Sequence, residues 1–115
     1  MTFINKAIIQ GNLGSDPVMK PKKGGKFVIF SVATEVEYSD KNGVQRKFVE
    51  WHNVAVFDDF LTLLARGNFK KGDLIRVEGT LSTTSWEGAD GKTNYRTQIV
   101  VRNSKIHKLE KIKLP

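Results

Sequence analysis

The chain has 115 residues, of which 39% are hydrophobic and 27% are charged, and its net charge is +7. This length supports one domain with one modest core, and the composition excludes both a disordered chain and one embedded in a membrane. The absence of cysteine excludes disulfides, zinc–thiolate sites and cysteine nucleophiles.

The positive charge favours a polyanion as partner, and nucleic acid fits better than a membrane surface. A membrane-surface protein needs a long basic amphipathic helix, and none is expected below. The N-terminus lacks the long apolar run of a signal peptide or a membrane span, so we expect a cytoplasmic protein.

Five short strands are predicted, because stretches rich in β-branched and aromatic residues alternate with clusters of Gly, Asn and Asp. The first strand covers about residues 3–13 and ends at a Gly-Ser-Asp-Pro turn. The second covers about 27–36, after a basic loop at 20–26. The third covers about 47–57, after an Asn-Gly turn.

One short helix follows the third strand. Asp58 or Asp59 is placed to cap it, and Gly67 suits its C-terminal end. The fourth strand covers about 73–81 and the fifth about 95–102, with a polar loop at 87–93 between them. The apolar side chains expected to form one stripe of the helix are Phe60, Leu61, Leu63 and Leu64.

Three strands, a helix and two strands is the element order of an OB-fold. We therefore expect an all-β protein: a five-stranded Greek-key barrel with one short helix between strands three and four. Another small barrel would have the same element order. The expected domain covers residues 1–103, and residues 104–115 form either an edge strand or a basic C-terminal extension.

The third predicted strand carries two large rings on one face. Alternation places Trp51 and Phe57 on one side and Val54 and Val56 on the other. If the valines point into the barrel, the rings point outward, where they need a partner. Unpaired bases stack on such rings with about 1–3 kcal/mol per base. The alternative is that both rings are part of the core, because aromatic side chains are more often buried than functional.

Two more aromatic side chains, Tyr38 and Trp86, are predicted just beyond strands, in polar segments where functional groups often lie. The second strand is apolar on both faces, since Phe27 and Ile29 alternate with valines and Phe30. Such a strand implies a neighbour outside the core, either the helix or another subunit.

Several segments agree in order and spacing, over about residues 4–102, with one known family. They are Ile4–Lys6 with Gly11–Pro17, Val32–Thr34, Glu50–Val54, Lys71–Gly72 and Val77–Leu81. Together they resemble the bacterial-type single-stranded DNA-binding proteins, which include phage and plasmid members. The Asn-Leu-Gly-x-Asp-Pro and Glu-Trp-His sequences are the specific part of this signal.

The resemblance implies an OB-fold that assembles, usually as a homotetramer, and binds and protects single-stranded DNA in replication, recombination or repair. Neither a cofactor nor a metal is implied. The family's stacking positions fall on Tyr38, Trp51, Phe57 and Trp86, and a histidine of subunit contacts falls on His52.

Phosphate contacts of the family fall on Lys6, Lys20, Lys41 and Lys71. Further basic side chains extend this set, although a solvated basic surface is their alternative role. The further candidates are Lys22, Lys23, Arg46, Lys47 and Arg96, with Arg102 as an additional cation.

The chain departs from the family at two places near the expected rings. Residues 82–85 read Ser-Thr-Thr-Ser where relatives carry Arg or Lys, and Asp58 and Asp59 follow Phe57 where a lysine is common. Both changes are expected to weaken the DNA path locally. Cellular members also end in an acidic tip that recruits enzymes, whereas this sequence ends in a lysine-rich segment. We therefore expect no recruitment through such a tip, and either a phage, plasmid or specialised member or a truncated chain.

Three other functions are compatible with parts of the sequence. A tailless primosomal OB-fold protein is disfavoured by the Glu-Trp-His sequence and Trp86, and a structural oligomerisation domain would use its tryptophans for protein contacts. A metal-dependent nuclease would need Glu50, His52 and His107. Two histidines without cysteine are a poor ligand set, so we expect no enzyme.

Overall fold

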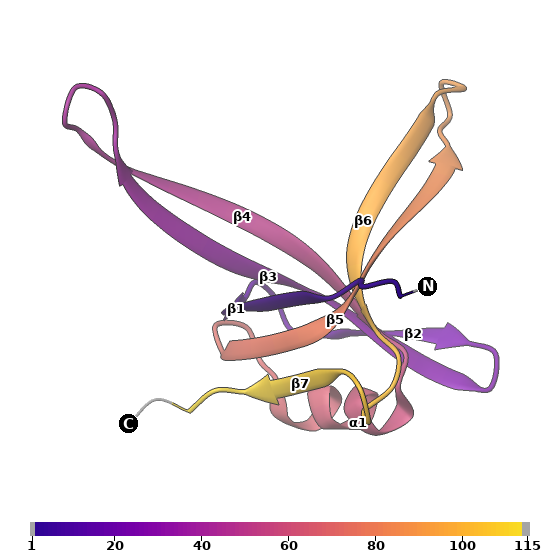
Figure 1. The fold of residues 1–115 in the computed structure, drawn as a ribbon. Helices are drawn as coiled ribbons and strands as arrows, with labels where there is room; N and C mark the ends of the chain where they lie inside the picture. Colours follow the sequence, from indigo (N-terminus) through magenta and orange to yellow (C-terminus); the bar gives the residue numbers. More distant parts are fainter. Residues whose placement is uncertain (1, 114–115) are drawn as a thin grey trace.

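Five strands close into a barrel in the computed structural model, which describes residues 2–113 (Figure 1). Every neighbouring pair is antiparallel except β4 and β6, which are parallel. This arrangement confirms the predicted OB-fold. Around the barrel the strands are β1 (Ala7–Leu13), β3 (Gly25–Ser39), β4 (Gln45–Val56), β6 (Thr93–Val101) and β5 (Leu74–Glu87), which pairs back with β1.

Three further elements surround the barrel. Strand β2 (Val18–Lys22) pairs with β3, and β7 (Lys108–Lys111) pairs with β5. Helix α1 (Asp59–Asn68) lies between β4 and β5 in the chain. It has ten residues, and within residues 2–113 no helix has the length and apolar character needed to cross a membrane.

Alternate side chains of the barrel strands form the core. Val28, Phe30 and Val32 of β3 and Val54 and Val56 of β4 point inward and are buried. Their neighbours along each strand therefore point outward, because successive side chains of a strand face opposite sides. The core is completed by Leu13, Leu61, Ala65, Phe69, Ile75, Val77, Ile99, Val101 and Leu109.

Helix α1 begins as predicted but faces the barrel differently. The Asp58 carboxylate caps it by accepting a hydrogen bond from the Leu61 N–H at 2.9 Å. Half of the predicted apolar stripe is confirmed, because Leu61 is buried and Leu64 packs against the core. Phe60 and Leu63 are instead more than 60% exposed, and Ala65, one turn after Leu61, completes the buried face.

The end of α1 also differs from the prediction. Gly67 lies inside the helix, which continues through Asn68. Phe69 follows directly and is buried, packing edge-on against the ring of Phe30. Burial of this ring holds the last turn of the helix against the barrel.

The predicted basic loop at residues 20–26 is instead part of a hairpin. The lysines and Pro21 are not typical of a strand, but β2 pairs only with β3. Such an edge strand tolerates proline, because one of its sides faces solvent and needs no N–H for pairing. Gly24, with φ of 83°, lies in the turn.

Two hairpins extend beyond the barrel as arms, one formed by β3 and β4 and the other by β5 and β6 (Figure 1). Tyr38 and Trp86 therefore lie within strands and not in loops, as their cross-strand partners Arg46 and Asn94 demonstrate. The predicted strands end too early, because cross-strand pairing depends on distant residues and continues into the polar segments that were expected to be loops.

The C-terminal segment forms an edge strand, one of the two predicted alternatives. Leu109 of β7 is buried, and the N–H of Ser104 donates to the Asp58 carboxylate at 2.8 Å. Lys111 pairs with Asp73 at 3.3 Å. Met1 and residues 114–115, which belong to the predicted domain and extension, lie outside the described residues.

Replacing Asp58 tests how the helix and this C-terminal segment are held together. Burial raises the pKa of Asp58, but hydrogen bonds from Leu61 and Ser104 outweigh it and leave the pKa below 3.8. The folded state thus favours the carboxylate, so its stabilisation is complete above the unfolded pKa and is lost as pH falls through the folded pKa. Asp58→Ala should lower the free energy of unfolding by about 1 kcal/mol, measured by urea denaturation at neutral pH.

The same variant should lose less stability than the wild type as the pH is lowered from about 5 to 2. Asp59→Ala is the matched control, since its carboxylate is 80% exposed and accepts no backbone hydrogen bond among the described residues. An equal loss of stability in both variants would contradict the role of Asp58.

Candidate functional site

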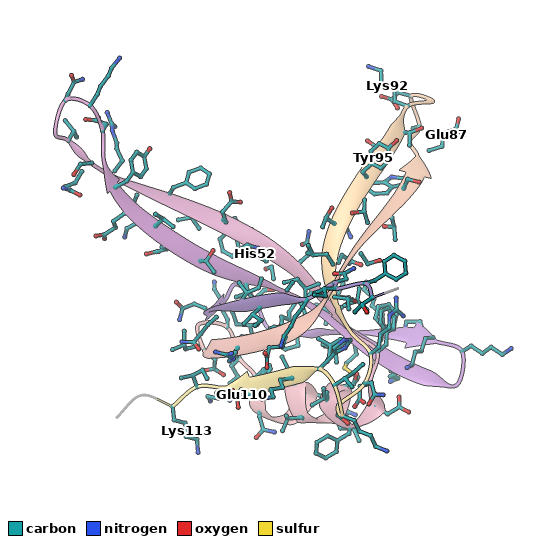
Figure 2. The ribbon with its side chains drawn as sticks, viewed as in Figure 1. His52, Glu87, Lys92, Tyr95, Glu110 and Lys113 are labelled. Carbon is teal, nitrogen blue, oxygen red and sulfur yellow. The ribbon has the colours of Figure 1, made fainter. Side chains whose placement is uncertain are left out.

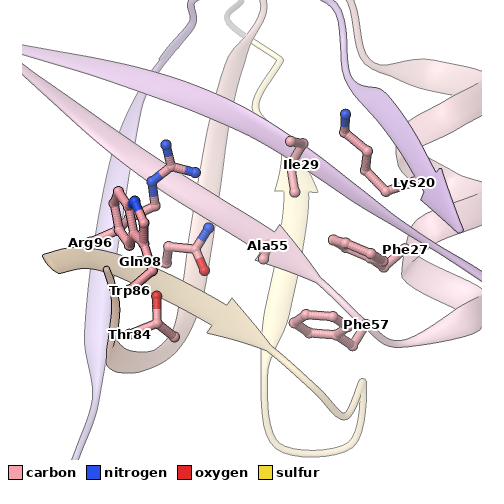
Figure 3. A pocket seen from close by; sticks show the side chains of 9 residues that line it. All are labelled: Lys20, Phe27, Ile29, Ala55, Phe57, Thr84, Trp86, Arg96 and Gln98. Atoms are coloured by element: carbon pink, nitrogen blue, oxygen red, sulfur yellow. The ribbon is translucent and has the colours of Figure 1, made fainter. Parts of the chain in front are cut away.

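A groove of about 550 Å³ runs over the outer face of the barrel (Figure 3). It crosses β3 and β4 and continues along the arm formed by β5 and β6 as far as Trp86. Its lining combines rings, apolar side chains, two cations and two uncharged polar groups. The lining residues are Lys20, Phe27, Ile29, Ala55, Phe57, Thr84, Trp86, Arg96 and Gln98.

Two stacked rings form one end of the groove. Phe57, just after β4, lies on Phe27 of β3 with ring centroids 4.8 Å apart and an interplanar angle of 24°. Lys22 Nζ lies 5.9 Å from the Phe57 centroid and the Arg102 guanidinium 5.7 Å from it. Cations so placed are attracted to the negative face of a ring.

Trp86 forms the opposite wall and is 47% exposed. The guanidinium of Arg96 lies 5.9 Å from the centroid of the Trp86 ring (Figure 3). Trp86 pairs across the hairpin with Asn94, and Thr84 pairs with Arg96, so Trp86 and Arg96 are diagonal neighbours on one face. The register of β5 and β6 thus places this ring and this cation together.

Gln98 connects the groove with two neighbouring hollows. One hollow shares Ile29, Arg96 and Gln98 with the groove and also contains Asn53. The other contains Asn53, Gln98 and Trp51. Because β4 and β6 are parallel, with Asn53 opposite Gln98, the two amides lie side by side. A continuous surface therefore leads from Phe57 to Trp51.

Trp51 is 60% exposed, as expected from the burial of Val54 and Val56 on the opposite face of β4. Its ring lies against the backbone of Gly14, where a Cβ atom would be only 2.3 Å from the ring carbon Cζ3 and 2.9 Å from Oγ of Ser31. Gly14 is fixed there because its N–H donates to the Ser31 carbonyl at 2.9 Å. The absent side chain thus makes room for the indole.

Tyr38, the fourth predicted ring, does not join this surface. Ala33 of β3 pairs with Trp51, so odd-numbered residues of β3 share the face of Trp51. Tyr38 has the opposite parity and lies on the other face of the arm, 48% exposed. The structure thus brings Trp51, Phe57 and Trp86 onto one surface and leaves Tyr38 apart.

Among the predicted basic residues, Lys20 and Arg96 line the groove. Four others form contacts within the protein. Lys22 donates to the Phe57 carbonyl at 2.7 Å, while Lys6 pairs with Glu78 at 3.6 Å. On the arm, Arg46 pairs with Asp40 at 3.1 Å and Lys47 with Glu35 at 3.5 Å.

Asp40 is a strong partner for Arg46. Hydrogen bonds from the Val44 N–H, the Arg46 side chain and the Asn42 N–H outweigh partial burial and hold the pKa of Asp40 below its usual value. The carboxylate is therefore ionised at neutral pH and offsets the charge of Arg46.

The remaining predicted residues lie outside the groove. Lys23 and Lys41 are exposed at hairpin turns, and the N–H of Lys71 donates to Asp16 at 2.8 Å. His52, labelled in Figure 2, hydrogen-bonds Thr34 Oγ1 at 2.9 Å and lines the hollow beside Trp51.

Five groove residues were not predicted as site residues: Phe27, Ile29, Ala55, Thr84 and Gln98. Phe27 was noted only as part of an apolar strand, because its stacking partner comes from a different strand. Gln98 is a single amide in the otherwise apolar end of β6, a signal that could have found it. Within the described residues this amide has no hydrogen-bond partner, so it is free for a ligand.

The residues that the disfavoured nuclease alternative would need do not assemble a metal site. Within residues 2–113, no three side chains of His, Cys, Asp or Glu lie close enough to hold a metal ion. His107 uses Nδ1 to accept the N–H of Arg102 at 2.9 Å. Both histidines therefore have structural hydrogen bonds.

Three comparisons with known proteins agree. Residues 4–107 match the sequence model of the single-strand binding protein family. A single-stranded DNA-binding protein of Rickettsia conorii is 35% identical over 102 residues, which cover 87% of this chain and 67% of that protein. A solved Plasmodium falciparum SSB, in complex with single-stranded DNA, matches with a TM-score of 0.89 and 27% identity over 98% of both chains.

The fit of Trp51 against Gly14 predicts the effect of one added methyl group. Gly14→Ala should displace the indole, since the half-exposed ring moves more easily than the backbone beneath it. In a Trp86→Phe background, where Trp51 is the only tryptophan, its fluorescence emission spectrum should shift. Gly67→Ala is the control, because no atom lies within 4 Å of its added Cβ. An unchanged Trp51 spectrum in the Gly14 variant would refute the contact.

Proposed function

The chain belongs to the single-strand binding protein family, and we propose that it holds single-stranded DNA on the surface between Phe57 and Trp51. Bases stack on the exposed rings, and nearby cations neutralise phosphates. The observation that carries this proposal is the continuous outer surface on which three aromatic positions lie, with cations beside Phe57 and Trp86.

Exposed rings of this kind select unpaired bases. In a duplex both faces of a base are covered by its neighbours in the stack, whereas a single strand can offer those faces to Trp51, Trp86 and Phe57. The rings distinguish single strands from duplexes without reading sequence. The protein is a DNA-binding protein and not an enzyme, and its family acts in replication, recombination and repair.

The proposed path begins at the stacked pair of Phe57 and Phe27, passes Gln98 and ends at Trp51. A glutamine amide both donates and accepts hydrogen bonds, so it can serve the edge of any base and adds little sequence preference. Lys20, Arg96 and Arg102 are the proposed phosphate contacts, since they lie in or beside the groove.

Other predicted residues have peripheral roles in this proposal. Tyr38 stacks a base only where the strand continues onto the opposite face of the arm. The exposed charges attract DNA from a distance and fix no phosphate in the groove. These charges are Lys6, Lys23, Lys41, Arg46, Lys47 and Lys71.

We also propose that the chain self-associates, as a homotetramer, with His52 near the contact. Strand β1 pairs with β5 along Ala7–Asn12 but with β3 only at Asn12 and Leu13, which leaves part of one edge open. Ile8 on this strand is half exposed. An open edge with an apolar side chain suits pairing with a second copy. We also propose that residues 1–103 are the binding domain and that residues 104–115 are an edge segment. The proposed location is the cytoplasm.

Titration of intrinsic tryptophan fluorescence tests the binding mode. Oligo-dT should quench the emission strongly and a duplex of equal length only weakly, because only unpaired bases can stack on the indoles. Plotted against log salt, log affinity for oligo-dT should fall with a slope of about −0.7 per neutralised phosphate. Equal affinity for both DNAs would refute the proposal.

Within the same titration, Trp51→Ala should weaken binding by about 1–3 kcal/mol while the variant stays folded. Phe60→Ala is the matched control, since this ring is 68% exposed but lies on helix α1, outside the groove. Equal effects of the two substitutions would mean that Trp51 contributes only general apolar surface.

Light scattering tests the proposed assembly. The wild type should have about four times the mass of one chain. Ile8→Glu should lower that mass, because a carboxylate would be buried in the contact without a partner. A wild-type protein with the mass of a monomer would refute self-association.

A further inference from the structure

We propose that Lys22 is a positioning residue, which fixes the Phe57 ring as a stacking platform and does not bind a phosphate. This inference rests on the proposed stacking of a base at Phe57. The sequence analysis instead predicted that Lys22 contacts a phosphate.

The ammonium group of Lys22 is already occupied by the protein. Nζ donates to the carbonyl oxygen of Phe57 at 2.7 Å and lies 3.5 Å from Oδ1 of Asp59. The same atom is 5.9 Å from the centroid of the Phe57 ring. The side chain is only 25% exposed. Two of the three N–H donors of Nζ thus face oxygen atoms of the protein, and the burial of most of the side chain restricts the approach of a phosphate to the third.

These contacts fix Phe57 at the point where β4 has ended and α1 has not yet begun. The Phe57 N–H donates to the Val101 carbonyl at 2.8 Å, so β6 holds one side of the residue and Lys22 holds its own carbonyl. With both polar backbone groups bound, the ring has a defined direction. Without Lys22, the carbonyl would lose its only partner among the described residues.

Lys22 also connects the two halves of the ring pair. It is the last residue of β2, the edge strand whose hairpin partner β3 carries Phe27. Fastening β2 to the segment after β4 therefore holds Phe27 against Phe57, whose centroids are 4.8 Å apart. The pairing of Val28 with Val56 places the two rings opposite each other, and Lys22 adds a side-chain contact that holds them there.

The acidic residue that departs from the family pattern has a role in this arrangement. Asp59 is 80% exposed, so its ion pair with Lys22 contributes little stability by itself. It does keep the ammonium directed toward the backbone of Phe57 and away from solvent. A carboxylate expected to weaken the DNA path instead helps to hold its platform.

A comparison of two lysines in the same hairpin tests the inference. Lys23 is exposed in the turn next to Lys22, and its side chain has no hydrogen bond or ion pair within the described residues. Affinity for oligo-dT is measured over a range of salt concentrations for Lys22→Met and Lys23→Met. Lys22→Met should weaken binding about fivefold with an unchanged salt slope, because it misplaces a ring. Lys23→Met should leave the stacking intact, and any loss of affinity it causes should come with a shallower slope.

A double-mutant cycle with Phe57→Leu separates action through the ring from direct contact. Leucine keeps the apolar volume but removes the stacking face. In this background, Lys22→Met should cause no further loss of affinity. The inference is overturned if the fivefold loss persists there, or if Lys22→Met makes the salt slope shallower by about 0.7.

The same variants distinguish this inference from the proposed function. If Phe57→Leu alone binds oligo-dT as tightly as the wild type, stacking at Phe57 is wrong. If it binds weakly and Lys22→Met still acts independently, only the role of Lys22 is wrong.

Asp59→Asn provides a test that does not depend on the stability of the Lys22 variant. Removing a negative charge beside the groove should tighten DNA binding if charge alone matters. We instead expect no gain in DNA affinity, because Lys22 loses the carboxylate that orients it. A gain of about twofold or more would overturn it.

Discussion

Alternation along β3 and β4 is the constraint on which the rest of the molecule depends. The same two strands carry core residues on one face and groove residues on the other. Because Val54 and Val56 point into the core, Trp51 must point outward. The large free energy of apolar burial thereby positions the exposed rings. No further stabilising interaction is needed to point these rings outward.

Each ring of the surface also has a local partner that limits its movement. Phe57 lies on Phe27, Trp86 lies beside Arg96, and Trp51 lies on the backbone of Gly14. These partners come from other segments of the chain, so the closure of the barrel brings them together. Rings held in this way would lose little freedom in the proposed stacking of a base, which would favour binding.

The sequence predicted what depends on neighbouring residues along the chain. Strand alternation correctly placed Trp51 outward, and Asp58 was correctly offered as a helix cap. Features that depend on distant segments were missed: the pairing that extends β3 past Tyr38, the edge strand hidden by Pro21, and the stacking of Phe27. Ion pairs belong to this second group, since charge alone does not reveal which lysines already have partners.

The two arms have a consequence for how tightly a ligand is held. Beyond the barrel each arm is a ribbon of two strands without a hydrophobic interior, so its tip can fray while the barrel stays closed (Figure 1). Ordering such ribbons around a flexible polymer reduces conformational entropy and subtracts from the affinity. A strand held partly by such ribbons would therefore be released more readily than one held by the barrel alone.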